Sequence, residues 1–275
     1  MTSKMLTSSL CTAEALSSDS FQSWCAQLGE RPGHMHRKVW EWAFICQALQ
    51  ERRFLRPGKR GLGFAVGTEP LSAFFASSGA SVLATDLATE EAIQAGWVST
   101  TQHASSRPAL NSRNLCGQAE FDRLVDFEFC DMNGIPEKYS GEFDFVWSSC
   151  ALEHLGSIQK GAEFIFNSMN CLRVGGVAVH TTEFNLSSNS DTVEQGGTVI
   201  FRRQDIEFIG DALYELGHEL GMNWERGQTE LDRFVDVPPY THNPHLKLQL
   251  GAYTTTSVGL IVRKCSENRW KISSV

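Results

Sequence analysis

The stretch that most constrains the fold of this chain runs from Gly61 to Ala88 and reads GLGFAVGTEPLSAFFASSGASVLATDLA. Residues 61–66 are mostly apolar, which is typical of a buried strand, and Gly67 then supplies a turn where the backbone can approach a ligand closely. A helical segment follows, and residues 81–85 form a second strand that ends at Asp86. The stretch therefore predicts a strand-turn-helix-strand unit that places an acidic residue at the end of its second strand.

Such a unit is typical of an open, parallel α/β sheet. In these sheets ligands bind outside the carboxyl ends of the strands, and an acidic residue at the end of the second strand can hold ribose hydroxyls. The glycines alone leave two interpretations open, since a glycine-rich turn can serve a cofactor or only tight packing. The position of Asp86 indicates a site for a nucleoside cofactor, and NAD is one of the alternatives.

Three further strands follow in the order that this kind of sheet requires. Residues 125–130 alternate as a strand and end in Asp131-Met132, and residues 142–149, EFDFVWSS, form the next strand. That strand runs into Cys-Ala-Leu-Glu-His-Leu at 150–155, and residues 177–180 are the fifth strand. Each strand therefore ends in polar residues that a parallel sheet would bring to one edge.

In their order and spacing, these segments resemble class I S-adenosylmethionine-dependent methyltransferases over residues 61–264. The family's acidic residue on the second strand is matched by Asp86, and the acidic residue whose loop covers the adenine is matched by Asp131, with Met132 beside it. The family's first motif is matched at Leu62, Phe64, Gly67 and Thr68. The resemblance implies S-adenosylmethionine as the cofactor and S-adenosylhomocysteine as the product.

The chain departs from the family at three positions of the first motif. Gly63 stands where the family usually has an acidic residue, and Ala65 and Glu69 stand where it usually has glycines. The family's acidic residue helps to hold the ammonium group of the cofactor's methionine part, which Gly63 cannot do. Because a partly buried cation needs a partner, we expect Glu69 to take this role. Its alternative role is to complement the dipole of the first helix.

The expected cofactor-binding residues lie on the turns and strand ends of the matched motifs. They are Gly63, Ala65, Gly67, Thr68, Glu69, Asp86, Leu87, Asp131, Met132, Ser148 and Ser149.

Catalysis of methyl transfer depends chiefly on positioning, and a hydroxyl acceptor also benefits from a general base. His154 follows the fourth strand and is the expected base, with packing at a helix start as its alternative role. We expect Glu183 and His180 to face the same mouth, where Glu183 could hold an acceptor hydroxyl or orient His154. A further alternative is a divalent-metal site built from Glu153, His154, Glu183, His242 and His245, although our preferred assignment contains no metal.

The composition indicates one cytoplasmic domain over residues 1–275. A net charge of -8 argues against nucleic acid, because phosphate binding needs clustered Lys and Arg. The eight cysteines include no C-x-x-C pair, so we expect reduced thiols. No segment approaches the roughly 20 apolar residues of a membrane span. Residues 1–20 are expected to be mobile, 21–58 to form a helical cap with Trp40 and Glu41 in a lid, and 59–264 to form the core.

The expected fold is α/β, a Rossmann-like doubly wound sheet of about seven strands, mostly parallel with an antiparallel last strand. The expected reaction is methylation of a polar small molecule, and the polar loops at the sheet's mouth favour a hydroxylated acceptor such as a saccharide. Three alternatives stay open: N-methylation of a small metabolite, a non-catalytic binding module, and an NAD-linked oxidoreductase, against which Asp131-Met132 weighs. A homodimer is also left open.

Overall fold

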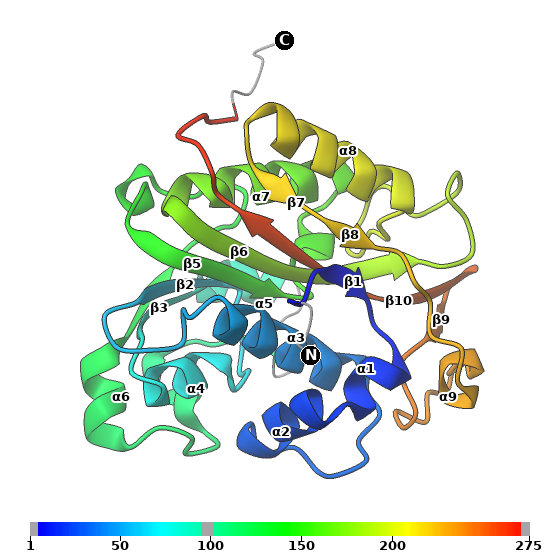
Figure 1. Cartoon of the computed structure of the whole chain (residues 1–275), viewed down its shortest axis with the longest axis horizontal. Helices are drawn as coiled ribbons and strands as arrows, with labels where there is room; N and C mark the ends of the chain where they lie inside the picture. The colour runs from blue at the N-terminus through cyan, green and yellow to red at the C-terminus, as the bar shows by residue number, and fades with distance from the viewer. Residues whose placement is uncertain (1–4, 95–101, 271–275) are drawn as a thin grey trace.

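The computed structural model describes residues 5–94 and 102–270, and within them a ten-stranded mixed sheet forms the centre of the molecule (Figure 1). Its parallel part consists, in spatial order, of β4 (Val125–Phe129), β3 (Ser81–Asp86), β2 (Arg60–Phe64), β5 (Phe143–Ser149) and β6 (Leu172–Asn185). The long strand β10 (Tyr253–Arg263) then runs antiparallel to β6. This order confirms the predicted Rossmann-like sheet, and its direction of winding reverses between β2 and β5.

The sheet has more strands than the expected seven, because short strands extend it around β10. β7 (Glu219–Leu220) and β9 (Leu248–Leu250) pair with β10, and β8 (Met222–Asn223) pairs with the N-terminal strand β1 (Ser8–Leu10). β1 also pairs with β10, and the backbone N–H of Ile261 donates to Ser8 Oγ at 2.8 Å. The prediction of a mobile segment over residues 1–20 is therefore wrong for its described part, where α1 (Ala13–Ser17) follows β1.

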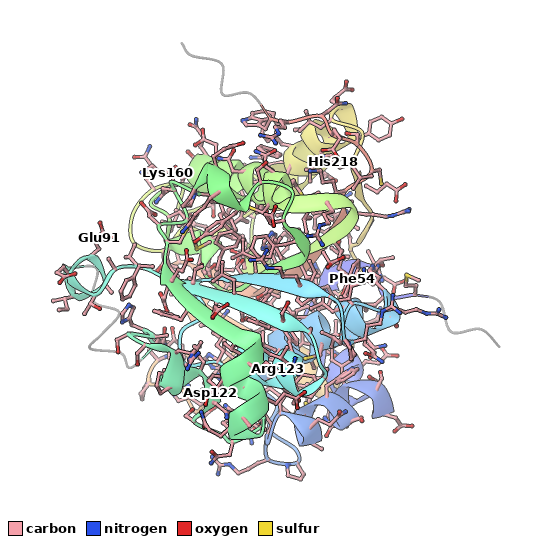
Figure 2. The ribbon with its side chains drawn as sticks, turned by 90° about the vertical axis from the view of Figure 1, so that its left-hand side faces the viewer. Phe54, Glu91, Asp122, Arg123, Lys160 and His218 are labelled. Carbon is pink, nitrogen blue, oxygen red and sulfur yellow. The ribbon has the colours of Figure 1, made fainter. Side chains whose placement is uncertain are left out.

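Helices cover both faces of the sheet (Figure 1). One face carries α1, α2 (Asp19–Gln27), α3 (Arg37–Glu51), α4 (Leu71–Ser77) and α6 (Gln118–Leu124). The other face carries α7 (Ile158–Cys171) and α8 (Arg203–Glu215). In Figure 2, Arg123 of α6 and Lys160 of α7 lie on opposite sides of the strands. The short helices α5 (Thr89–Gln94) and α9 (Glu230–Arg233) lie in connections. None of the described helices is long and apolar enough to cross a membrane.

Helix α3 belongs to the core and does not form the expected lid. Trp40 and Phe44 are fully buried, and their rings stack with centroids 4.9 Å apart. Glu41 is also fully buried, and its Oε2 accepts hydroxyl hydrogen bonds from Ser149 and Thr181 at 3.2 and 3.3 Å. Aromatic burial of this kind fixes α3 firmly against β5, β6 and β10. The helix therefore offers a rigid wall, and not a moving cover, to whatever lies beside it.

A candidate cofactor site at the carboxyl edge of the sheet

A cavity of about 520 Å³ opens at the carboxyl ends of the parallel strands, on both sides of the point where the winding reverses. Its volume lies within the range of about 300–1,000 Å³ that is typical of small-molecule sites. The segments that follow β2, β3, β4 and β5 all contribute to its wall. Ten of the predicted site residues line it: Ala65, Gly67, Thr68, Glu69, Asp86, Leu87, Asp131, Met132, Ser149 and His154.

The backbone is strained in the two turns that follow β2 and β5 and line this cavity. Ala65, after β2, has φ 46°, and Cys150, after β5, has φ 52°. A side chain beyond glycine rarely adopts this left-handed conformation, and such strain is concentrated at functional sites. The conformation of Ala65 also shows why related motifs favour glycine there. Gly67 has φ 51°, and a Cβ atom on it would collide with the carbonyl oxygen of Gln102.

Asp86 holds the walls of the cavity together through its carboxylate. Its Oδ2 accepts the backbone N–H groups of Gly67 and Ala104, both at 3.0 Å, and its Oδ1 accepts the N–H of Leu87 at 2.8 Å. Burial raises the pKa of Asp86, while these donors counteract the rise. A carboxylate offers about four acceptor positions, so about one remains for a ribose hydroxyl. To bind both ribose hydroxyls, as expected, the Asp86 carboxylate therefore has to give up one of its three backbone hydrogen bonds.

Glu69 lies at the far side of the same turn, where the methionine end of the cofactor is expected. Its buried Oε2 has no well-formed hydrogen bond among the described residues, although Trp42 and Ser149 lie nearby. Burial raises the pKa of the Glu69 carboxyl from its ordinary value of 4.5, and Lys38 opposes the rise. The result is a pKa of about 7. A buried carboxylate oxygen with an open acceptor position is the group that an ammonium ion requires.

Lys38 was not predicted, yet it lines the cavity from α3. Its ammonium group lies 3.5 Å from Glu41 Oε2, and nearby acidic groups outweigh burial and raise its pKa. A fixed cation beside Glu69 can receive a carboxylate, so the pair matches the two charges of an amino acid. Other cavity residues that the prediction omitted are Trp42, Glu91, Gln102, His103, Arg113, Cys130, Asn133, Cys150, Ala151 and Leu155. Gln102, His103 and Arg113 belong to the polar stretch 98–114, whose composition predicts a surface loop that either faces the substrate or is a plain insertion.

His154 lines the cavity from the short 3₁₀ helix Leu152–His154 that follows β5. Its Nδ1 lies 2.8 Å from the carbonyl oxygen of Gly197. Because a carbonyl oxygen can only accept, Nδ1 carries the proton, and Nε2 of the neutral ring has the lone pair that a base needs. Nε2 lies 4.0 Å from Glu153 Oε1. The ring is thus oriented by a backbone carbonyl, and not by Glu183 as anticipated.

Glu183 lies outside the cavity wall, on the α3 side of the sheet. Arg37 Nη2 pairs with its Oε2 at 2.7 Å, and the residue is 2% exposed. Burial raises the pKa of Glu183, and Arg37 lowers it. This placement gives no support to contact with an acceptor.

Three other expected positions serve the core. A Cβ atom on Gly63 would collide with the side chains of Trp147 and Val66, so glycine is needed there for packing. Ser148 and Ser168 contact the two ring nitrogens of His180 at 2.9 and 3.2 Å. His180 is fully buried, and burial lowers its pKa to about 3. The expectation that His180 faces the mouth is therefore wrong, and Ser148 lies outside the cavity wall.

The alternative metal site drawn from Glu153, His154, Glu183, His242 and His245 is not assembled. Glu153 and Glu183 gather with Cys150, whereas His242 and His245 gather with His36. The two groups are separate, so no single ion can use the five expected ligands.

No family model and no curated protein matches this chain. Solved structures with a similar fold include the magnesium protoporphyrin IX methyltransferase of Synechocystis PCC 6803 with bound S-adenosylhomocysteine, at 14% identity, 91% and 97% coverage of the two chains and a TM-score of 0.49. An S-adenosylmethionine-dependent methyltransferase of Mesorhizobium loti matches at 21% identity with a TM-score of 0.35, over about half of each chain, 50% and 52%.

A third is phosphoethanolamine N-methyltransferase 2 of Haemonchus contortus, in complex with phosphomonomethylethanolamine and S-adenosylhomocysteine, at 18% identity, 70% and 40% coverage and a TM-score of 0.42. At such low identities and TM-scores, the function has to be derived from this chain's own residues.

Proposed function

We propose that this chain is an S-adenosylmethionine-dependent methyltransferase that acts on a polar small molecule. The observation that carries the proposal is one cavity that joins Asp86 and Asp131, at the ends of neighbouring strands, to the pair Glu69 and Lys38. An adenosine part can occupy the region of the two aspartates. A zwitterionic amino-acid part can occupy the region of Glu69 and Lys38. An NAD site has no use for the second pair, because a dinucleotide carries no amino-acid group.

The residues at the mouth suit transfer to a hydroxyl. When bound, the cofactor supplies an electrophilic methyl group on its sulfonium. His154, with its proton held on Nδ1 by Gly197, can accept the proton of a hydroxyl at Nε2. The fixed ring orientation holds the base in place, which is one part of the alignment of reacting groups that the reaction needs. We therefore favour O-methylation of a hydroxylated acceptor, such as a saccharide, over N-methylation, since an uncharged amine nucleophile has less need of a base.

Thermal denaturation with different ligands tests the proposal. A ligand that binds only the folded state raises Tm, by a free energy that grows with its concentration relative to Kd. We expect S-adenosylmethionine and S-adenosylhomocysteine to raise Tm and NAD to leave it unchanged; the reverse result would reject the proposal in favour of an oxidoreductase. A non-catalytic module would bind both sulfur ligands but form no methylated product across a panel of polyhydroxylated acceptors.

A further inference from the structure

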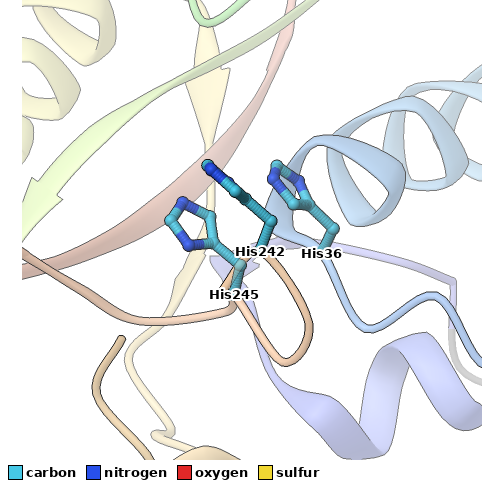
Figure 3. A group of neighbouring side chains, drawn as sticks. All are labelled: His36, His242 and His245. Carbon is cyan, nitrogen blue, oxygen red and sulfur yellow. The ribbon is translucent and has the colours of Figure 1, made fainter. Parts of the chain in front are cut away.

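Three histidines gather at a second place, away from the cavity wall (Figure 3). His36 precedes α3, and His242 and His245 lie on the connection between α9 and β9. One ring nitrogen of each lies within 4.8 Å of the others. The rings of His36 and His245 stack with centroids 4.7 Å apart, and those of His242 and His245 lie 5.2 Å apart. Two segments about 200 residues apart in sequence thus build one imidazole cluster.

We propose that His36, His242 and His245 bind one divalent transition-metal ion of borderline softness, such as Zn²⁺. Imidazole nitrogen is a preferred ligand of such ions, and three histidines with one open position form a known type of zinc site. In a tetrahedral site, ligand atoms about 2.0–2.1 Å from the ion lie about 3.3 Å from one another. The nitrogens therefore need to approach by about 1.5 Å at most, and His242 is on an exposed loop where such a movement is easy.

Asp236 provides the second layer that a metal-binding histidine usually has. Its Oδ2 lies 2.6 Å from His245 Nδ1, so Nδ1 donates and the lone pair of the neutral ring is on Nε2. A carboxylate behind a ligating imidazole fixes its tautomer and increases its basicity. The same carboxylate accepts the backbone N–H groups of Thr241 at 2.9 Å and His242 at 3.0 Å. Asp236 therefore shapes the loop that carries two of the three proposed ligands.

The third ligand is held beside this loop by backbone hydrogen bonds. His245 N–H donates to Met35 O at 2.7 Å, and Arg37 N–H donates to His245 O at 3.0 Å, so His36 is fixed between them. His36 Nδ1 accepts the N–H of Lys38 at 3.1 Å as the cap of α3. Coordination through Nδ1 exchanges this one capping bond for a metal–nitrogen bond and keeps the proton on Nε2. The cluster is thus largely formed before an ion arrives, and binding orders little additional chain.

An ion at this place would tie the α9–β9 connection to the start of α3. The next residues along the helix, Arg37 and Lys38, reach Glu183 and the cavity, respectively. The ion would have a structural role, because it would hold α3, which lines the cavity, in place without contacting the reacting groups.

The test uses the full chain, freed of metal with a chelator and dialysed. Titration with ZnCl₂ in a calorimeter should show one ion per chain, Zn²⁺ should raise Tm, and Co²⁺ should give the visible absorption bands of imidazole coordination. The key variant is His242→Asn, because His242 has φ 61° and Asn tolerates this conformation without an imidazole. It should weaken Zn²⁺ binding by at least about a hundredfold, given that even outer-layer changes cost 10–100-fold.

The matched control is His34→Ala, which removes a neighbouring histidine that pairs with Glu30 at 3.1 Å. It should change Zn²⁺ affinity by less than about threefold, well below the cost of a lost ligand. Absence of Zn²⁺ binding to the wild-type chain, unchanged affinity in His242→Asn, or equal losses in both variants would each overturn the proposal. The Tm of metal-free His242→Asn confirms that the variant is folded. No readout uses S-adenosylmethionine, so the result is independent of the proposed methyltransferase function.

Discussion

Replacing Glu69 by Gln separates its two expected roles, because the substitution keeps the size of the side chain and removes its charge. The carboxylate is enclosed beside the cavity, its Oε2 has no well-formed hydrogen bond among the described residues, and burial raises its pKa to about 7. A charge kept in such a place is unfavourable to the ligand-free fold, because Lys38 only partly offsets the cost of its burial. It becomes favourable when an ammonium group arrives.

The binding cost follows from the contact that would be lost. A hydrogen bond to a charged group contributes about 1.5–3 kcal/mol, which corresponds to about 10- to 150-fold in Kd. Glu69→Gln should therefore weaken S-adenosylhomocysteine by this factor. It should leave 5'-methylthioadenosine unchanged, because that ligand has no ammonium group.

The pH dependence has two consequences of definite sign. The pKa of Glu69 in the folded chain, about 7, lies above its ordinary value of 4.5, so between these values the folded state binds more protons than the unfolded state. The contribution of this group to stability therefore decreases as pH rises from 4.5 through 7. Ligand-free Glu69→Gln should accordingly melt above wild type at pH 8, and the two curves should converge near pH 4.5.

S-adenosylhomocysteine needs the ionised carboxylate, so its affinity for wild type should fall about tenfold from pH 7.5 to pH 6, with proton uptake by Glu69 as the cause. At more alkaline pH the ligand's own α-amino group loses its proton, and affinity should fall again. Calorimetric titration of both ligands against both proteins at several pH values measures these effects. Equal losses for the two ligands, or an acid limb that persists in Glu69→Gln, would refute the assignment of Glu69 as the ammonium partner.

Three further substitutions test the rest of the site. Lys38→Met should weaken S-adenosylhomocysteine but not 5'-methylthioadenosine, and the opposite preference would remove Lys38 from the methionine end. Asp86→Ala should weaken both ligands by about 1–3 kcal/mol and also lower Tm, because three backbone N–H donors lose their acceptor; unchanged affinity would exclude Asp86 from the site. His154→Gln should lower turnover of the identified acceptor by about a hundredfold with little change in cofactor affinity, whereas near-normal turnover would leave His154 a packing role.

Sequence patterns were sufficient where the signal is local. The run from Gly61 to Asp86 carries its own strand, turn and helix signals, so the end of β3 and the turn after β2 were placed correctly at the cavity. The strands predicted at β4 and β5 likewise placed Asp131 and His154 correctly at the same edge of the sheet. Parallel strands align their carboxyl ends whatever their detailed packing. This general geometry made it possible to predict which residues lie together at the carboxyl edge, although none of their contacts was known.

Patterns failed where a residue's surroundings depend on a distant partner. The fifth strand was expected to end at residue 180, which would leave Glu183 in a mouth loop, but β6 continues to Asn185. It continues because β10 pairs with it from Val177 to its end, where Thr255 lies opposite Asn185. Glu183 therefore stays within the sheet and meets Arg37 of α3. The same strand β10 recruits the three residues of β1, whose own pattern carries no strand signal.

The remaining misassignments depend on a shift of one residue in sequence. Successive side chains of a strand point to opposite faces, so Ser149 reaches Glu41 and the cavity while Ser148 turns to His180 in the core. In helix α3, Lys38 and Trp42 are four residues apart and share the cavity face, whereas Trp40 and Phe44 share the buried one. Periodicity shows which residues share a face. Only the packed sheet decides which face meets the cavity, and for that reason Lys38 had no sequence signal of its own.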